Sequence, residues 1–395
     1  MTSPPTPPAH STGGGADFAG ASFDAILKLA VARGASDIHV KAGDVIRVRV
    51  DGNLVPMGEK PLTVQQVRAL AERVVGDGRL REGLDSIREH DCSYAVQDLG
   101  RFRANVLRQR GSVMLVLRAI PIEVPTFADL RLPAVIETLT RIERGLVVVT
   151  GMTGSGKSST QAAMIEHLNQ RVRKHVVTLE NPIEFLFRDK LCSVTQREVG
   201  PDTDSFATGL RSAMRQDPDV ILIGEMRDGE TIDIALKAAE TGHLVLSTLH
   251  TPDALSTIHR MLAAFPPQEQ RSVRVRLAES LRAVISQRLL RARSGAGRVL
   301  ACEVMVMTAT IRDMIIAEHP LEEIRELMHE GGESYGSQTF DQHLEQLVRE
   351  ELVSYETALA ASTNSADFGL RFRLGGRPAA ATAAPGPLAG YDLAG

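Results

Sequence analysis

The sequence has no tryptophan, and aromatic residues make up only 4% of its 395 positions. Because apolar residues still account for 43%, a sizeable core is expected from aliphatic side chains. The formal net charge is −4, which is not the basic balance of a general nucleic-acid binder. Alternating aromatic and basic stretches are also missing. The composition therefore predicts no direct nucleic-acid partner.

Cysteine is scarce as well, with only Cys92, Cys192 and Cys302. They are far apart and none forms a C-x-x-C pair, which excludes a disulfide framework and a zinc knuckle. No apolar run reaches about 18 residues, so no transmembrane helix is expected. The first residues lack the basic start and apolar middle of a signal peptide. These absences predict a cytoplasmic protein with reduced thiols.

The distribution of residue types predicts two domains between two tails. Residues 1–18 and 374–395 are rich in Pro, Gly, Ala, Ser or Thr and are expected to be disordered. Residues 19–120 mix one helical pattern, short alternating strands and a second helix, which is typical of a small α+β domain. Residues 121–133 contain three prolines and are interpreted as a linker.

From residue 134 to 362, apolar strands alternate with helical segments. Strands that are apolar throughout indicate burial on both faces, and strand–helix alternation indicates a parallel sheet covered by helices. Beyond Asp253 the sequence is expected to be mostly helical, broken by the strand-like "GRVLACEVMVM". This region is predicted to be an α/β domain with C-terminal helices.

A phosphate-binding loop is the clearest motif. The segment "GMTGSGKS" at 151–158 fits G-x-x-x-x-G-K-[ST] and lies between the apolar strand "GLVVVT" and a helix. Glycines let backbone N–H groups converge on an anion, and the helix N-terminus adds positive potential. Lys157 is expected to reach the β- and γ-phosphates, and the Ser158 hydroxyl to bind Mg²⁺. The residues expected to bind nucleotide are Gly151, Thr153, Gly154, Ser155, Gly156, Lys157, Ser158 and Ser159.

Acidic residues close two of the following strands. "DPDVILIGEMRD" carries Glu225 at its strand end, where a carboxylate can take a proton from the attacking water. Gly224 occupies the position where many P-loop enzymes have a metal-linked aspartate. Glu180, at the end of "HVVTLENPIEF", is the candidate that replaces it as a catalytic and Mg²⁺-linked carboxylate, with Glu184 nearby. A solvated loop acid is the alternative interpretation of Glu180.

Two histidines flank the strand in "TGHLVLSTLHTPDA". His243 precedes it and His250 follows it. A neutral imidazole can hydrogen-bond a γ-phosphate or a carboxylate, so His243 is a candidate catalytic residue and His250 a candidate nucleotide contact. A histidine at a strand edge that serves only packing is the alternative, and the spacing offers no further zinc ligands.

Taken together, these segments resemble secretion ATPases, and most closely the type IV pilus retraction ATPases of the PilT/PilU group. The resemblance rests on "GMTGSGKSS", "TLENPIEF", "VTQREVG", "LRSAMRQDPDVILIGEMRD" and "AAETGHLVLSTLHT" in this order. Further support comes from "GASDIHV" and "VRVDGNL" before the phosphate loop, and from "FPPQEQ" and "GGESYGSQTFDQHL" after it.

The resemblance implies a RecA-like P-loop ATPase core with an N-terminal PAS-like α+β domain. It implies a homo-hexamer that uses ATP and Mg²⁺ to power pilus retraction and twitching motility. The expected partners are an inner-membrane platform protein and a paralogous retraction ATPase, and the expected location is the inner face of the cytoplasmic membrane. The family also uses arginines of its N-terminal domain near the nucleotide, which points to Arg118 and Arg103 in "RFRANVLRQRGSVMLVLRAIP".

Two departures from the family pattern keep alternatives open. The resemblance places the family's acidic box at Glu180–Glu184, and Asn181 stands where that box usually has an aspartate. A weakly hydrolysing accessory retraction subunit is therefore an alternative. The segment "TIRDMI" at 310–315 differs from the expected "AIRNLI", a motif tied to retraction. A pilus-assembly or type II secretion ATPase is the other alternative. The absence of a four-cysteine zinc insert and of a longer N-terminal region speaks against it. A DNA-translocating P-loop ATPase is disfavoured by the acidic charge.

Overall fold

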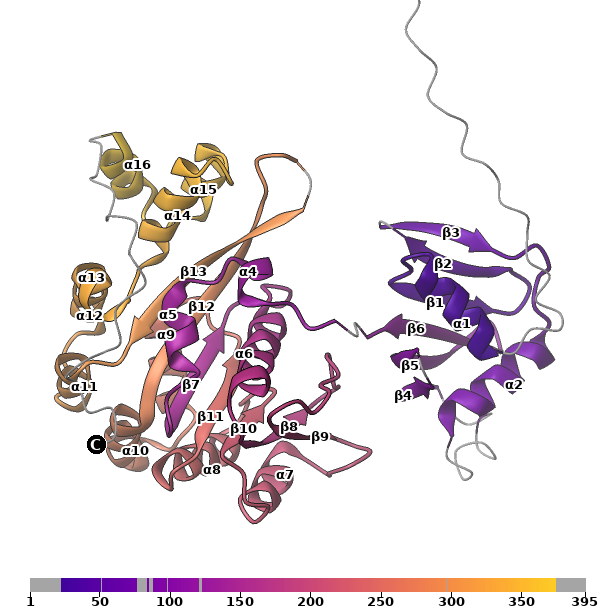
Figure 1. Ribbon diagram of the computed structural model, residues 1–395, viewed down its shortest axis with the longest axis horizontal. Coiled ribbons are helices and arrows are strands. Elements are labelled where there is room, and N and C mark those ends of the chain that lie inside the picture. Colours follow the sequence, from indigo (N-terminus) through magenta and orange to yellow (C-terminus); the bar gives the residue numbers. More distant parts are fainter. Residues whose placement is uncertain are drawn as a thin grey trace, which may run out of the picture. The chain divides into compact units, whose positions relative to one another are not determined.

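The computed structural model describes residues 23–50, 52–76, 84, 88–97, 99–120, 123–295 and 297–373 (Figure 1). The chain divides into two compact units, Met1–Ile122 and Glu123–Gly395, and each is described by itself. The tails predicted at 1–18 and 374–395 lie outside the described residues, as do the first two positions of the predicted linker. The rest of that linker contains one short helix, α4 (Phe127–Leu130), which begins after Thr126.

The first unit is built on one six-stranded sheet in the order β3-β2-β1-β6-β5-β4, with every neighbouring pair antiparallel. Its strands are β1 (Asp37–Lys41), β2 (Ile46–Val50), β3 (Asn53–Met57), β4 (Glu89–Val96), β5 (Gly100–Gln109) and β6 (Ser112–Ala119). The strand alternation predicted from the sequence is present. Along β5, Phe102, Ala104 and Val106 are buried, while the residues between them point away from the core.

Among the described residues of this unit, helices α1 (Phe23–Ala32) and α2 (Val64–Val75) cover one face of the sheet. Their apolar residues pack in one cluster with the buried strand positions. Helix α2 begins with a capping box, in which Gln66 N–H donates to Thr63 Oγ1 at 3.2 Å and Thr63 N–H donates to Gln66 Oε1 at 2.8 Å. The opposite face of the sheet carries the alternating polar positions.

The second unit contains a seven-stranded sheet in the order β13-β12-β7-β11-β10-β8-β9. All neighbours are parallel except β12 and β13. The strands are β7 (Gly145–Thr150), β8 (His175–Glu180), β9 (Ser193–Glu198), β10 (Val220–Ile223), β11 (Leu244–Leu249), β12 (Leu281–Arg291) and β13 (Arg298–Val306). Every residue of β7, β10 and β11 is buried, which confirms the interpretation of these runs as central strands.

Helices cover both faces of the second sheet. One face packs against α5 (Ala134–Leu139) and α6 (Lys157–Arg171). The other face packs against helices that all follow β9, namely α7 (Phe206–Ala213), α8 (Gly229–Glu240), α9 (Ala254–Ala263), α10 (Pro267–Ser280), α11 (Ala309–Ile316) and α12 (Leu321–Glu330). The valines of β7 alternate between these two cores, and burial of each contributes about 1.5–3 kcal/mol.

The expectation of mostly helical structure with one strand beyond Asp253 is wrong in one respect. Residues 281–291 form β12, an eleven-residue strand paired with β7 on one side and β13 on the other. Helix α10 ends at Ser280 and β12 starts at Leu281, with no turn residue between them. Pairing with two neighbouring strands, rather than a local signal, decides this structure.

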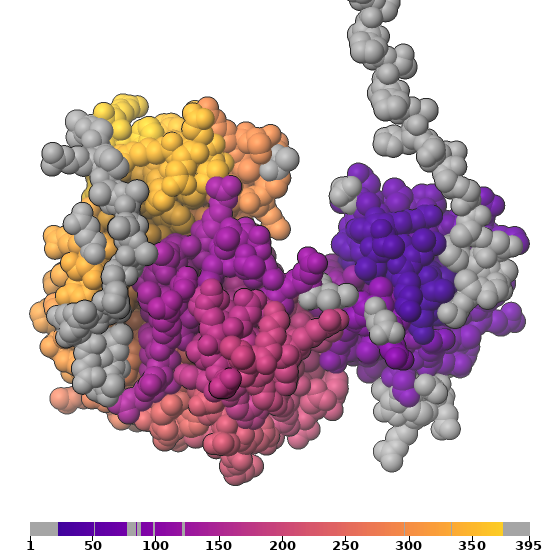
Figure 2. All heavy atoms as spheres, viewed as in Figure 1, coloured from indigo at the N-terminus to yellow at the C-terminus, as the bar shows by residue number. Residues whose placement is uncertain are grey.

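The chain ends in a group of short helices, α13 (Gly332–Tyr335), α14 (Phe340–Arg349), α15 (Tyr355–Ala361) and α16 (Ser365–Arg373). Helices α14 to α16 share a small core with β12 and β13 around Phe340 and Phe368. In the space-filling view, the yellow C-terminal helices form a continuous layer on the second unit (Figure 2). Within the described part of the chain, no helix is both long and apolar enough to cross a bilayer.

Candidate functional site

The predicted phosphate loop joins the end of β7 to the start of α6. Gly151, Gly154 and Gly156 have positive φ angles of 140°, 78° and 94°. Gly151 also permits a close approach, because a Cβ there would lie 2.5 Å from both Gln287 O and Ser155 Oγ. An alanine at 151 would therefore force the loop off β12. Ser158 and Ser159 lie half-buried in the first turn of α6.

Lys157 is folded back onto its own loop. It is buried, and its Nζ donates to Gly151 O at 2.8 Å and to Met152 O at 3.0 Å. Burial lowers the pKa of Lys157, while the nearby carboxylates of Glu184 and Glu225 favour its charged form. The acidic segments after β8 and β10 therefore lie near enough to the phosphate loop to act electrostatically on Lys157.

Glu225 lies just beyond β10, at the carboxyl edge of the sheet. Its Oε2 forms an ion pair with Arg227 Nε at 2.7 Å and lies 3.6 Å from His250 Nε2. The Glu225 side chain is 14% exposed, whereas those of Arg227 and His250 are 75% and 47% exposed. Glu225 and His250 were each predicted from the sequence as site residues, but their proximity was not. Arg227 was not, although it follows Glu225 by two residues.

Glu180 closes the neighbouring strand β8 and is tied into a local hydrogen-bond network. Its Oε1 accepts from Thr178 Oγ1 at 2.7 Å and from Gln196 Nε2 at 3.1 Å. Its Oε2 accepts from the Glu184 N–H at 3.3 Å. Burial raises the pKa of Glu180, and these hydrogen bonds oppose that effect. This carboxylate is therefore not the solvated loop acid of the alternative interpretation.

Gly224 has a packing reason to lack a side chain. A Cβ at this position would lie 3.3 Å from Leu179 O and 3.5 Å from both Glu180 Cα and Phe206 Cε1. The Gly224 N–H also donates to Leu179 O at 2.7 Å. The end of β10 thus runs close to β8, and a side chain at 224 would require this backbone to move by a few tenths of an ångström.

The two histidines lie at opposite ends of β11. His250 follows the strand and lies beside Glu225, whereas His243 precedes it, level with the start of β7. His243 Nδ1 is 2.9 Å from Ala238 O and its ring lies next to Thr241. The six residues of β11 separate the two, and the seven residue steps from His243 to His250 span about 23 Å. Within this unit, His243 is not brought to the phosphate loop, so the catalytic role predicted for it is not supported there.

Arg118 and Arg103 lie in the first unit, directly opposite each other on β6 and β5. Both are exposed. Arg118 Nε donates to Asp37 Oδ1 at 2.8 Å, and its side chain is 68% exposed. The sequence analysis did not single out Asp37, because only the strand register brings residues 37 and 118 together.

Two further residues behind the phosphate loop escaped the sequence analysis. Ser286 Oγ accepts from Thr150 Oγ1 at 3.0 Å, and Gln287 Nε2 donates to Thr160 Oγ1 at 2.6 Å. Both are buried on β12. They fasten the two flanks of the loop to the neighbouring strand. The only available signal was two adjacent polar residues directly after the apolar run "AVI".

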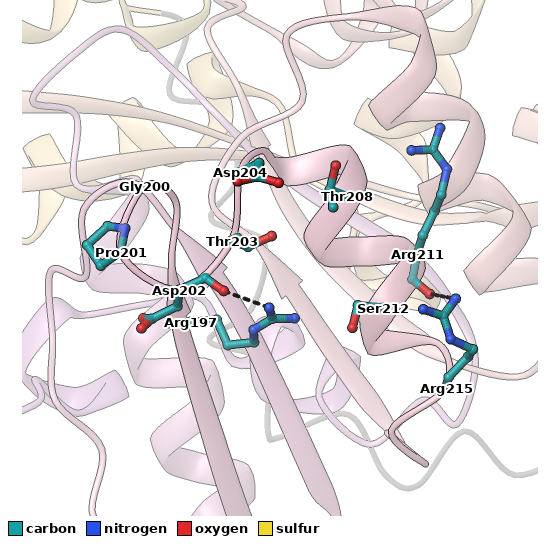
Figure 3. Close-up of a pocket in the computed structure, with 10 residues that line it drawn as sticks. All are labelled: Arg197, Gly200, Pro201, Asp202, Thr203, Asp204, Thr208, Arg211, Ser212 and Arg215. Carbon is teal, nitrogen blue, oxygen red and sulfur yellow. Dashed lines mark hydrogen bonds between the residues drawn. The ribbon is translucent and has the colours of Figure 1, made fainter.

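A separate polar cavity of about 530 Å³ lies between the end of β9 and α7 (Figure 3). Three arginines line it, Arg197, Arg211 and Arg215, together with Ser, Thr and Asp side chains. Arg197 Nη2 donates to Asp202 O at 2.8 Å and Arg215 Nη1 to Arg211 O at 3.0 Å. None of the site residues predicted from the sequence lines this cavity.

Comparison with known proteins agrees with this geometry. Residues 16–357 match the family model described as type II/IV secretion system protein. The type IV pilus retraction ATPase PilT of Pseudomonas aeruginosa is 45% identical over 84% of this chain and 96% of its own. The type IV pilus ATPase PilU of the same organism is 39% identical over 89% and 92%.

A solved structure is also similar, the pilus retraction motor PilT with bound ADP. It is 44% identical, covers 87% of this chain and 98% of its own, and gives a TM-score of 0.80. This likeness confirms the predicted fold class, a P-loop ATPase core preceded by an α+β unit. The chain belongs to the type II/IV secretion system protein family.

Proposed function

We propose that this chain is the ATP-hydrolysing motor that powers retraction of type IV pili. The observation that carries the proposal is the 45% identity to a pilus retraction ATPase along 96% of that relative's length. The chain is an ATPase of its family and binds nucleotide. Lys157 and Glu225, the two groups on which turnover would most depend, are both present and lie near one another.

In the proposed reaction, N–H groups of residues 151–158 and the Lys157 ammonium hold the triphosphate. Glu225 accepts a proton from a water molecule as the water oxygen bonds to the γ-phosphorus. The bond between that phosphorus and the β,γ-bridging oxygen then breaks, leaving ADP and inorganic phosphate. Glu225 must first leave its ion pair with Arg227, which gives His250 and Arg227 a role in controlling when the base is free.

Mg²⁺ is proposed as the cofactor. The described residues hold no group of three His, Cys, Asp or Glu side chains that would form a protein cage for a metal ion. Nucleotide-bound Mg²⁺ does not need one, because phosphates and waters supply most of its ligands. The Ser158 hydroxyl fits a direct ligand, and Glu180 fits a carboxylate that acts through water. When bound, the ion neutralises charge on the β- and γ-phosphates.

Arg118 and Arg103 are proposed to offset charge on the γ-phosphoryl group in the transition state. Two observations support this role. Both side chains are exposed, and both lie on the face of the sheet opposite to the helices. Nucleotide binding would close the first unit over the phosphates of the same or a neighbouring chain. A homo-hexameric ring would pass this closure from subunit to subunit. Its proposed partners are the platform protein of the inner membrane and a paralogous ATPase, at the cytoplasmic face.

A weakly hydrolysing accessory retraction subunit is the second candidate. Asn181 in the acidic box and the 39% identity to PilU favour it. In that case nucleotide would still bind, but pili would retract only when the paralogous ATPase is active. Comparing retraction with and without that paralogue separates the two functions.

The test is to follow fluorescently labelled pili in cells that carry Lys157→Ala at the native locus. We expect long, static pili that still assemble, and normal retraction in a Lys237→Ala control, whose lysine only pairs with Asp233 on helix α8. Loss of pili would instead support an assembly motor, and unimpaired retraction would contradict the proposed function.

A further inference from the structure

Four charged residues form one row across the open face of the first unit. In β-sheet register, Asp37 of β1 lies opposite Arg49 of β2 and opposite Arg118 of β6. Arg118 in turn lies opposite Arg103 of β5. The strand positions on either side of this row point into the core with α1 and α2. The row is therefore Arg49-Asp37-Arg118-Arg103, on the face that the helices leave uncovered.

This row contains three guanidinium groups and one carboxylate. Like charges placed directly opposite on antiparallel strands destabilise a sheet, so Arg118 and Arg103 oppose folding unless an anion offsets them. Asp37 supplies part of that offset, since its Oδ1 is 2.8 Å from Arg118 Nε and its Oδ2 is 3.9 Å from Arg49 Nε. Arg103 has no ion-pair partner among the described residues.

Asp37 is well placed to stay ionised. The residue is 8% exposed, and Ser36 Oγ donates to its Oδ2 at 2.8 Å. Burial alone would raise the pKa of Asp37, but hydrogen bonds from Ser36 and Arg118 outweigh it and lower the pKa below its ordinary value. The carboxylate is thus a fixed, largely buried anion beneath an exposed arginine.

The contact with Asp37 fixes the Arg118 side chain but leaves its terminal NH₂ groups available. Only Nε of Arg118 meets Asp37, and the two terminal NH₂ groups have no hydrogen-bond partner within the described part of the chain. A guanidinium held through Nε keeps its outer fork free for an oxyanion, with less conformational entropy left to lose on binding. Arg103, which no described carboxylate holds, lacks this constraint.

We propose that Asp37 is a positioning residue for Arg118. Its carboxylate holds the guanidinium in the orientation in which the terminal NH₂ groups meet the γ-phosphoryl group in the transition state. This inference rests on the proposed function, because it requires Arg118 to act in ATP hydrolysis. It adds a residue that touches no nucleotide and acts only through Arg118.

The test is a double-mutant cycle on the full-length chain, with steady-state ATPase kinetics as the readout. We expect Asp37→Asn to lower kcat about 10-fold and to change KM by less than about 2-fold, because orientation in the transition state is lost rather than binding. In an Arg118→Ala background, Asp37→Asn should have no further effect. Asp37→Glu, which keeps the charge, should recover part of the rate.

A matched control comes from the same face of the unit. Asp44 forms ion pairs with Arg47 and Lys41 but lies outside the row, so Asp44→Asn should leave kcat and KM unchanged. Circular dichroism and thermal melting check that each variant is folded. If Asp37→Asn does not fold, the Asp37→Glu variant completes the cycle with Arg118→Ala.

Two results separate failure of this inference from failure of the proposed function. If Arg118→Ala lowers turnover but Asp37→Asn keeps wild-type kcat, or costs as much in the Arg118→Ala background as alone, Asp37 does not act through Arg118. If Arg118→Ala itself retains full turnover, the role proposed for Arg118 is wrong, and the positioning role of Asp37 falls with it.

Discussion

In the second unit, most of the predicted site groups lie at or just beyond the ends of buried strands, whereas in the first unit they lie along the exposed face of strands. Glu180 ends β8, Glu225 and His250 follow β10 and β11, and the phosphate loop follows β7. Parallel strands bring such positions to one edge of the sheet whatever their separation in sequence. Arg118 and Arg103 instead meet through antiparallel register. The sheet edge of the second unit can be predicted from the order of strands along the chain. The sheet face of the first unit can be predicted only when the strand pairing is known.

The two units also differ in how burial affects charge. In the first, hydrogen bonds from Ser36 and Arg118 outweigh burial and lower the pKa of Asp37. In the second, burial outweighs the hydrogen bond from Ala254 N–H and raises the pKa of Glu303 to about 7. Burial lowers the pKa of His343 to about 4. Asp37 is therefore kept charged, whereas Glu303 and His343 favour their neutral forms.

The largest effect is expected at the phosphate loop. Lys157→Ala should lower kcat/KM by more than about 1,000-fold, because a cation that meets the phosphates is lost in both binding and the transition state. Titration with a fluorescent ATP analogue should show weakened affinity together with lost turnover. Lys237→Ala, at an exposed position of α8, is the matched control. Turnover by a folded Lys157→Ala protein would remove the loop from the reaction.

The next largest effect is expected at the strand-end acid. Glu225→Gln should lower kcat on the order of 100- to 1,000-fold while ATP still binds, since a carboxamide cannot accept the proton. Single-turnover phosphate release combined with equilibrium binding measures both quantities. Glu326→Gln, an exposed position on α12, should behave as wild type. Steady turnover in Glu225→Gln would mean that another group is the base.

A smaller effect is expected from the sheet face of the first unit. Arg118→Ala should lower kcat about 10- to 100-fold with little change in nucleotide affinity, as for loss of one transition-state cation. Arg47→Ala on the same face, whose arginine pairs with Asp44, is the control. Equal losses of affinity and turnover would make Arg118 a binding residue, and an unchanged rate would make the face unrelated to hydrolysis.

The smallest effect concerns stability against pH, through Glu303 and His343. Between about pH 4.5 and 6.5 the folded chain keeps a proton on Glu303 that the unfolded chain releases, so this group lowers stability as pH rises. His343 acts oppositely, because the unfolded chain protonates it below about 6.5 and the folded chain only near 4. In the wild type the two contributions offset each other over this window.

Glu303→Gln should expose the contribution of His343. The glutamine oxygen can still accept from Ala254 N–H, so the fold is expected to persist. The free energy of unfolding should then fall by about 2 kcal/mol from pH 6.5 to 4.5, more steeply than in the wild type. Urea denaturation across this range measures it, with the exposed Glu322→Gln as control. Parallel pH profiles for wild type and Glu303→Gln would contradict the offset.

The sequence was informative for the sheet edge of the second unit because its groups lie at the ends of strands that are largely apolar. The phosphate loop, Glu225 and His250 were each placed after such a strand, and parallel strands bring these positions to one edge. His243 shows the limit of this reasoning. It lies in the same motif as His250, but the six residues of β11 lie between them, so His243 is at the opposite edge of the sheet from the phosphate loop.

Strand β12 and Asp37 could not be predicted, for related reasons. In "LRAVISQRLLR" the apolar residues recur at helical as well as strand spacing, and no breaker separates them from α10. The structure is decided by pairing with β7, which lies far away in sequence, and with β13, which follows β12 closely. Asp37 and Arg118 are 81 residues apart, and a register shift of one residue would place Asp37 in the core. Non-local pairing determines both.

The central claim is that this chain binds a nucleoside triphosphate through its phosphate loop and hydrolyses it. The most direct measurement is phosphate release by the purified full-length protein, followed as a function of ATP concentration in the presence of magnesium. We expect saturable turnover by the wild type. A correctly folded wild-type protein with no affinity for ATP and no phosphate release would contradict it.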